Sequence, residues 1–281
     1  MQNLPHISHK ASGLRLFLMT VLGRAYPRVV GTQREVSWLL FDVLMPMGGV
    51  IGYALVYKAI HAPEDYVGFV VVGGAMIAFW MNVLWSMSSQ LYWEKEQGNL
   101  ALYIISPANL MAILLGMAVG GLVATTIRAI VVIVFGSLIF QVHYVLTSVW
   151  QLGVVFVLCM TALYGMGMMA SSMFLLLSRE AWHIANLIQE PVSLASGFYF
   201  PIKFFPFWVA AAASLIPLTL GLDAIRQLIF ASGPTLGFIS VSLEIWILLG
   251  LSIIFIAGAR LLLKKMENLA KREGRLTEAR R

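Results

Sequence analysis

Long runs of hydrophobic residues without a single charge dominate the chain. No Asp, Glu, Lys or Arg occurs within residues 66–93, 97–127 or 129–178. A helix of about 20 apolar residues crosses the ~30 Å hydrocarbon core of a bilayer, so each run is long enough to span a membrane. Helix is expected because every backbone polar group in lipid must be satisfied within its own segment. The pattern predicts an all-α integral membrane protein with six transmembrane helices, over residues 37–57, 66–91, 109–140, 149–177, 182–200 and 239–260.

The composition indicates the same class. Of the 281 residues, 60% are hydrophobic and only 11% are charged, whereas soluble domains carry about 25% charged residues. The single Cys159 provides no disulfide framework, and the five histidines show no metal-ligand spacing. We interpret residues 1–281 as one transmembrane domain. It comprises a cytoplasmic or interfacial N-terminal segment, a six-span core and a cytoplasmic tail, over residues 1–36, 37–260 and 261–281 respectively.

The positive charges predict the topology. In the six-span arrangement one side carries all of the 19 Lys and Arg residues except Lys58, Arg128, Lys203 and Arg226. Because Lys and Arg accumulate in cytoplasmic loops, both termini are expected in the cytoplasm. The expected location is the plasma (inner) membrane of a bacterium. The same bias accounts for the isoelectric point of about 9.5, so a nucleic-acid partner is not expected.

The segment 201–232 is apolar enough to raise the number of spans to seven, which would place the basic C-terminal tail outside. Four of the ten prolines, at positions 191, 201, 206 and 217, lie within or just before this segment. Proline removes a backbone donor and breaks helices. We therefore predict short re-entrant helices between spans five and six, which dip into the outer leaflet without crossing it.

An amphipathic helix is predicted before the first span. Its apolar positions follow the helical repeat: Leu14, Phe17, Leu18, Val21, Leu22 and Ala25. Such a helix lies along the cytoplasmic membrane surface, where it contacts lipid, or packs on a neighbouring subunit. The pairs Gly48/Gly52 and Gly116/Gly120 have the G-x-x-x-G spacing that permits close helix approach.

Two stretches resemble a known family. The loop after the second span reads Glu-Lys-Glu-Gln-Gly-Asn-Leu over residues 94–100 and ends in Ser106-Pro107. The second stretch reads Ser-Gly-Phe-Tyr-Phe-Pro over residues 196–201, followed by Pro206, Trp208, Pro-Leu-Thr at 217–219, Asp223 and Arg226. Both resemble motifs of ABC-2 type permeases, the membrane subunits of a class of ABC exporters. The chain departs from the usual Thr, Glu and Asn of these motifs at Asn99, Ala101 and Ile216.

The resemblance implies a dimer of six-span subunits, expected here to be two identical copies within membrane lipid. Each subunit would rest on a separate P-loop ATP-binding subunit, and the complex would export lipids, lipid-linked glycans or drugs. The chain lacks a G-x-x-x-x-G-K-[ST] loop. We therefore expect no enzyme activity and no cofactor in this chain, with ATP and Mg bound by the partner. The alternative function is an ion-gradient-driven secondary transporter or channel, which would use buried carboxylates near the midplane.

The resemblance also implies site residues. A coupling helix, or alternatively an ordinary connecting loop, would present its charges to the ATPase while Leu100, Leu102 and Ile104 hold it to the membrane; its residues are Glu94, Lys95, Glu96, Gly98 and Leu100. An outer gate, or alternatively a structural plug, would be formed by the re-entrant residues Gly197, Phe200, Pro201, Pro206, Pro217, Asp223 and Arg226.

Polar residues within the spans are candidates for a translocation path. Arg128 is the costliest to place, since an arginine at a helix centre costs about 2.5–3.5 kcal/mol on insertion scales. It is expected to face protein or a wet cavity, with Glu190 as a candidate partner, or to snorkel to an interface. Asp42 and Glu244 are expected to reach the interface. Phe198 and Tyr199 are further path candidates, with simple packing as the alternative.

Overall fold

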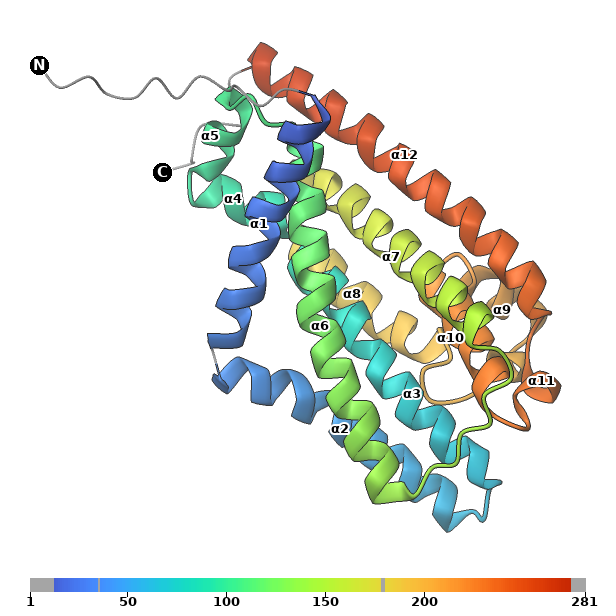
Figure 1. The fold of residues 1–281 in the computed structure, drawn as a ribbon. Coiled ribbons are helices and arrows are strands. Elements are labelled where there is room, and N and C mark those ends of the chain that lie inside the picture. The colour runs from blue at the N-terminus through green and yellow to red at the C-terminus, as the bar shows by residue number, and fades with distance from the viewer. Residues whose placement is uncertain (1–12, 35, 178–179, 274–281) are drawn as a thin grey trace, which may run out of the picture.

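The computed structural model describes residues 13–34, 36–177 and 180–273, and every regular element within these ranges is helical (Figure 1). The elements in chain order are α1 Leu14–Arg34, α2 Val36–Ala59, α3 Glu64–Met81, the π-helical turn η1 Asn82–Met87, α4 Gln90–Glu96, α5 Asn99–Ile105, α6 Leu110–Phe140, α7 Val149–Leu177, α8 Glu180–Ala195, the 3₁₀ turn η2 Ile202–Phe204, α9 Phe207–Ala213, α10 Pro217–Ile229, α11 Gly233–Leu236 and α12 Val241–Glu273.

Five helical segments among the described residues are long and apolar enough to cross a membrane. They are Leu40–Ala59, Glu64–Glu96, Leu110–Phe140, Val149–Met173 and Val241–Asn268. The pair α9 and α10 would add a sixth if it formed one span, but the two helices are bent by 107°. The all-α integral membrane fold predicted from the hydropathy pattern is confirmed.

The span predicted over residues 182–200 is too long. Helix α8 ends at Ala195 and has 16 residues, which at 1.5 Å per residue is about 24 Å, shorter than a ~30 Å hydrocarbon core. Gly197 has φ +73°, a left-handed conformation that ends the helix and that only glycine adopts at little cost. The apolar residues after Gly197 extend the hydrophobic run without extending the helix.

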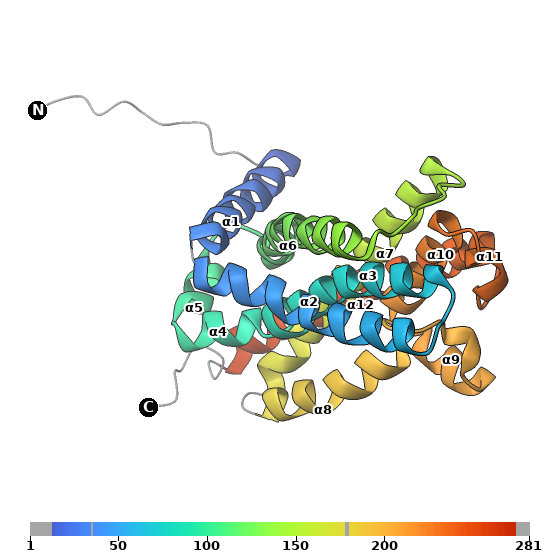
Figure 2. The same ribbon diagram turned by 90° about the horizontal axis from the view of Figure 1, so that it is seen from below.

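Helices α2 and α6 pack against α3, whose residues 67–80 are all buried, and α7 packs against α6 and α12. Figure 1 shows the start of α1 and the end of α12 at the end of the bundle where α4 and α5 lie. The α2–α3 and α6–α7 connections and α9 to α11 lie at the opposite end. Figure 2 shows α1 and α6 on one side of α2 and α3, with α8 on the other. The bundle therefore separates a face formed by α1 and α6 from a face formed by α8.

Helix α1 packs on α6 of its own chain, an arrangement that the sequence interpretation did not consider. Gly116 and Gly120 of α6 lie against the backbones of Val21 and Ala25, and a Cβ at either glycine would lie within 2.8 Å of their carbonyl oxygens. The predicted close approach at Gly116/Gly120 is thus confirmed. Part of the predicted apolar face stays exposed, since Leu14 is 74% and Leu22 68% exposed.

The segment between α8 and α12 returns to its starting point, as predicted for a re-entrant element. The Lys203 ammonium, at its beginning, donates a 2.6 Å hydrogen bond to the Thr235 carbonyl at its end. The Ser232 N–H donates to Asp65 at the first turn of α3. All residues of α10 from Pro217 to Leu228 are buried, so α10 is packed against protein, the condition under which broken helices are tolerated at membrane depth.

Single-cysteine labelling tests this hairpin. Cys159 is fully buried, so Lys203→Cys and Thr235→Cys can be made in the natural chain. We expect a membrane-impermeant maleimide to label both positions from the same side of the membrane. Glu96→Cys, at the opposite end of the bundle, serves as the control and should react only from the other side. Labelling of Lys203→Cys and Thr235→Cys from opposite sides would contradict the re-entrant fold.

Candidate functional site

The short helices α4 and α5, with the turn between them, connect the second span to α6. They lie at the end of the bundle that also holds the start of α1. The π-helical turn η1 and the short helix α4 continue α3 as one segment, Glu64–Glu96. Gly98 has φ +77° and reverses the chain into α5, a conformation that glycine allows. Single π-turns of this kind are frequent at functional sites. The sequence motif of residues 94–100 therefore forms a helix-turn-helix corner.

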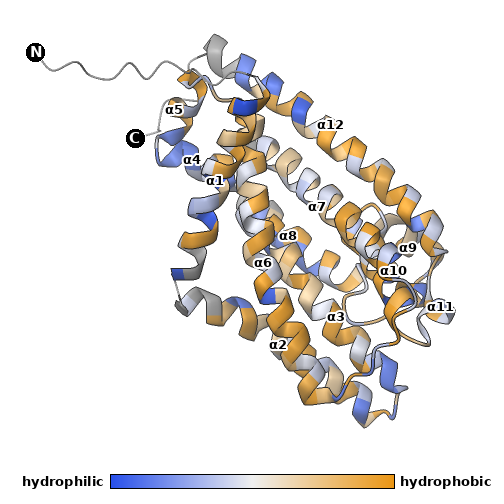
Figure 3. Ribbon diagram, in the orientation of Figure 1, coloured by the Kyte–Doolittle hydropathy of each residue, from blue (hydrophilic) through white to orange (hydrophobic). Residues whose placement is uncertain are grey.

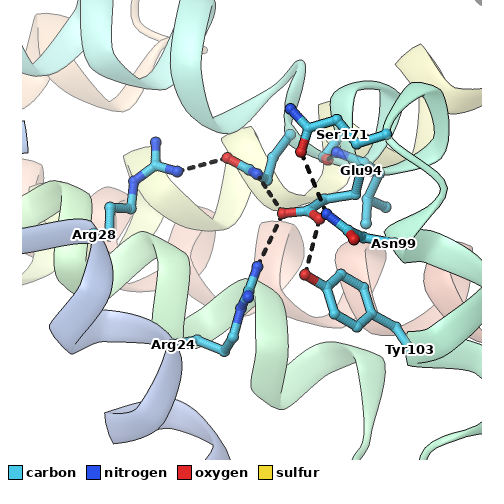
Figure 4. Close-up of polar contacts among 9 residues, drawn as sticks. Arg24, Arg28, Glu94, Asn99, Tyr103 and Ser171 are labelled. Carbon is cyan, nitrogen blue, oxygen red and sulfur yellow. Dashed lines mark hydrogen bonds and ion pairs between the residues drawn. The ribbon is translucent and has the colours of Figure 1, made fainter. Parts of the chain in front are cut away.

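Glu94 is the centre of a polar cluster in this corner (Figure 4). Its carboxylate accepts a 2.9 Å hydrogen bond from the Arg24 guanidinium and a 2.8 Å bond from the Tyr103 hydroxyl. The Gln90 amide donates a third bond of 3.0 Å. The Arg24 guanidinium also lies over the Tyr103 ring, 4.9 Å from its centroid. Helices α1, α4 and α5 are thereby tied together through one carboxylate.

Arg28, one helical turn after Arg24, extends the cluster towards the middle of the bundle. It donates to Gln90 at 2.5 Å and to Ser86, and burial lowers its pKa. On the opposite side of the corner the Leu91 N–H donates to the hydroxyl of Ser171 on α7, over 3.3 Å. The corner is therefore bonded both to α1 and to α7.

Tyr103 stays protonated over the physiological pH range. Burial, followed by the hydrogen bond to Glu94, raises its pKa to about 12. Its hydroxyl therefore remains a donor to the carboxylate, because a phenolate would repel it.

The structure corrects the expected role of Glu94. Glu94 is only 5% exposed, and its hydrogen-bond partners lie within the same chain. Its charge is therefore not available at the surface for an ion pair with an ATPase subunit. The exposed part of the corner consists of Glu96, Gln97 and Gly98, with Lys95 half-buried. Leu100 is buried as expected, whereas Leu102 is 59% exposed.

Sequence reasoning missed the partners of Glu94 because they are distant in the chain. Arg24 lies 70 positions before Glu94 and Arg28 lies 62 before Gln90. A signal did exist: Arg24 and Arg28 stand one helical turn apart in α1, and a pair of cations on one face calls for an acidic or polar partner.

A second polar site holds the turn after α8. Arg226 of α10 is 3% exposed. Its guanidinium donates to the carbonyl oxygens of Gly197 at 2.5 Å, Phe198 at 2.7 Å and Phe69 at 2.8 Å. The side chain of Phe198 is fully buried. Arg226 therefore fastens the re-entrant segment to α3 through backbone acceptors.

The neighbouring aromatic residues connect this turn to α2. Tyr199 stacks on Tyr53 with ring centroids 3.9 Å apart, and the Tyr57 hydroxyl donates to the Tyr199 carbonyl at 2.9 Å. A Cβ at Gly73 of α3 would overlap the Phe198 carbonyl oxygen, so only glycine fits there. The burial of Phe198 favours packing over direct contact with a cargo, whereas Tyr199 keeps some exposure.

The other re-entrant residues have structural positions. Pro206 is the N-cap of α9 and Pro217 is the first residue of α10, where proline loses no helical hydrogen bond. Asp223 does not pair with Arg226: it accepts from Gln227 at 3.1 Å and from the Phe238 N–H at 2.8 Å. Two further predicted residues precede α9: Pro201, which is the N-cap of η2, and Phe200, whose ring contacts Phe205 edge-on.

Arg128 is buried against protein, as predicted, but its partner is Asp42 of α2 and not Glu190. The Arg128 side chain is 9% exposed and that of Asp42 is 35% exposed. The expectation that Glu244 reaches the interface is wrong, because Glu244 is fully buried. Glu190 is exposed on α8 and accepts a long 3.4 Å bond from Gln189.

Breaking the Arg128–Asp42 pair should cost more than removing it altogether. We expect Arg128→Leu to lower the free energy of unfolding by about 1–3 kcal/mol, since it leaves Asp42 without its cation in a half-buried place. The double variant Arg128→Leu with Asp42→Leu should recover most of this loss, because an apolar pair replaces the charges. Thermal unfolding in detergent measures the stability of both variants. A double variant as unstable as Arg128→Leu would show that the unpaired Asp42 carboxylate is not the cause of the loss in stability.

The family resemblance is confirmed by comparison with known proteins. The family model of the ABC-2 type transporter matches residues 29–230, which is more than two thirds of the chain. The chain belongs to the ABC-2 type transporter family.

Two curated relatives are similar to part of the chain. The probable multidrug ABC transporter permease YbhR of Escherichia coli strain K12 is 26% identical over 164 residues. The alignment covers 58% of this chain and 44% of the relative, and the same permease of Escherichia coli O157:H7 aligns equally. The chain thus matches less than half the length of these relatives.

Proposed function

We propose that the chain is the membrane subunit of an ATP-driven exporter. It moves an amphipathic cargo, a lipid, a lipid-linked glycan or a drug, out of the cytoplasm or the inner leaflet. ATP and Mg bind to a separate P-loop subunit, and a second copy of this chain completes the pathway. Both termini lie in the cytoplasm of a bacterial cell, and the protein lies in its plasma (inner) membrane.

The corner around Glu94 is the observation that supports this proposal best. A buried carboxylate joins α1, α4 and α5, so a force applied to the exposed tip at Glu96 to Gly98 reaches α1 and the second span together. The hydrogen bond from the Leu91 N–H to the Ser171 hydroxyl extends the connection to α7. A rigid corner at one end of several spans is what a soluble motor subunit needs in order to move them.

Reconstitution with the ATP-binding subunit tests the function. We expect the chain alone to hydrolyse no ATP, because it has no phosphate-binding loop. The complex should hydrolyse ATP and translocate a fluorescent lipid or drug across vesicles, and replacing the P-loop lysine of the partner should stop both. Steady ATP turnover by the partner-free chain would contradict the proposal. Transport driven by a proton gradient without ATP would support the secondary transporter instead.

A further inference from the structure

Two hollows meet at the end of α12 that lies beside α1. The first, of about 720 Å³, is formed between α1, α6, α7 and α12, with Phe17, Leu115, Met168 and Ile256 on its walls. The second, of about 660 Å³, runs along α12 past Ile253 and Leu261. Residues of α12 alone line the second hollow, so it is an open groove on the face of that helix. Their common boundary is the stripe Ile256, Arg260 and Lys264, which follows the four-residue repeat of one helix face.

The two cations of this stripe lie at the depth of the lipid headgroups. No charge occurs in α12 between Glu244 and Arg260, a distance of 16 residues or about 24 Å along a helix. This apolar length approaches the ~30 Å hydrocarbon core. Figure 3 shows α12 hydrophobic along the bundle, with its hydrophilic positions gathered at the end beside α1. Arg260 and Lys264 are both exposed.

The charge around the hollows favours an anion. Within the described ranges, no carboxylate forms an ion pair with Arg260 or Lys264, and Glu267 is the one acidic residue on the walls. Helix α6 starts at the same place: Asn109 is its N-cap, and its first turn holds no acidic residue. The N-terminus of this 31-residue helix adds a partial positive charge that attracts anions.

We propose that these hollows bind an anionic phospholipid. Its phosphate group lies between Arg260, Lys264 and the start of α6, and its two acyl chains occupy the two hollows that meet there. A basic pocket between membrane helices at headgroup depth is the arrangement that binds anionic lipid headgroups. Because α1 and α6 form walls of the first hollow, the lipid also connects α12 to α1, the helix whose Arg24 donates a hydrogen bond to Glu94.

Native mass spectrometry of the full chain tests this site. The purified protein is mixed with equal amounts of dioleoyl phosphatidylglycerol and dioleoyl phosphatidylcholine. We expect preferential retention of phosphatidylglycerol, and a loss of about 10–30-fold in its affinity in Arg260→Gln with Lys264→Gln, since each cation near a membrane surface contributes about a factor of five. Thermal unfolding confirms that the exposed substitutions leave the fold intact.

Two further variants distinguish a built site from general attraction. Lys265→Gln is the matched control, because Lys265 is exposed beside Lys264 but lines neither hollow; it should keep full lipid retention. Ile256→Trp keeps both cations and narrows both hollows, so it should lose the lipid. Equal retention of the two lipids, an equal loss in Lys265→Gln, or displacement of the lipid by inorganic phosphate would each overturn the proposal.

Discussion

Replacing Glu94 by lysine is expected to destabilise the protein by about 3 kcal/mol or more and to abolish transport. The carboxylate is buried and accepts hydrogen bonds from Arg24, Gln90 and Tyr103. An ammonium group in its place leaves those three donors without an acceptor and stands next to the Arg24 guanidinium. Removing one partner of a buried pair typically costs about 3–5 kcal/mol. Thermal unfolding of the purified chain and its yield in membranes measure the effect.

Glu96→Lys provides the matched control for this prediction. Glu96 lies two positions further on the same helix, carries the same charge and is exposed. Its substitution should change stability by no more than about 0.5 kcal/mol, and should weaken ATPase docking by no more than the ~0–1 kcal/mol of an exposed ion pair. Equal stability of the two variants would show that Glu94 does not hold the corner together. Loss of transport in Glu96→Lys with normal stability would assign the docking contact to the exposed tip.

The contrast between these two glutamates shows where sequence reasoning stops. The loop motif and its Gly98 turn were predictable, because a glycine that follows a charged segment at the end of a span indicates a turn. The burial of Glu94 was not, because α4 has only seven residues and so short a helix shows no reliable periodicity. Its burial depends on α1, whose packing follows from the small residues Gly116 and Gly120 on a helix that comes later in the chain.

The same limit applies inside the bundle. Hydropathy predicts the long spans because lipid makes the same demand on every residue of a span. It does not select the partner of Arg128, because Asp42 and Glu190 both lie within predicted spans and the choice depends on α2 packing beside α6. Likewise, the end of α8 depends on the conformation of Gly197, which an average over an apolar window does not detect. Pairing and boundaries come from tertiary contacts.

The turn after α8 carries the second large expected effect, in Gly73→Ala. A Cβ at this position would overlap the Phe198 carbonyl oxygen and would stand 3.0 Å from the Arg226 guanidinium. The obstacle is backbone, so a rotamer change does not relieve it. We expect the substitution to displace the turn and to lower the free energy of unfolding by about 3 kcal/mol. Gly52→Ala is the control: a Cβ there meets open space, and alanine in a helix should stabilise slightly, by about 0.5–1 kcal/mol.

Arg226→Met should reproduce the effect of Gly73→Ala, because it removes the donors of the same turn. Three buried carbonyl oxygens lose a charged donor, and each acceptor left unsatisfied costs about 1–3 kcal/mol. Since both substitutions release one turn, their combination should cost clearly less than the sum of the two. Thermal unfolding of the natural chain, the two single variants and the double variant gives the four stabilities of this double-mutant cycle. Additive losses, or a Gly73→Ala variant as stable as Gly52→Ala, would show that Arg226 and the close approach at Gly73 do not act on the same turn.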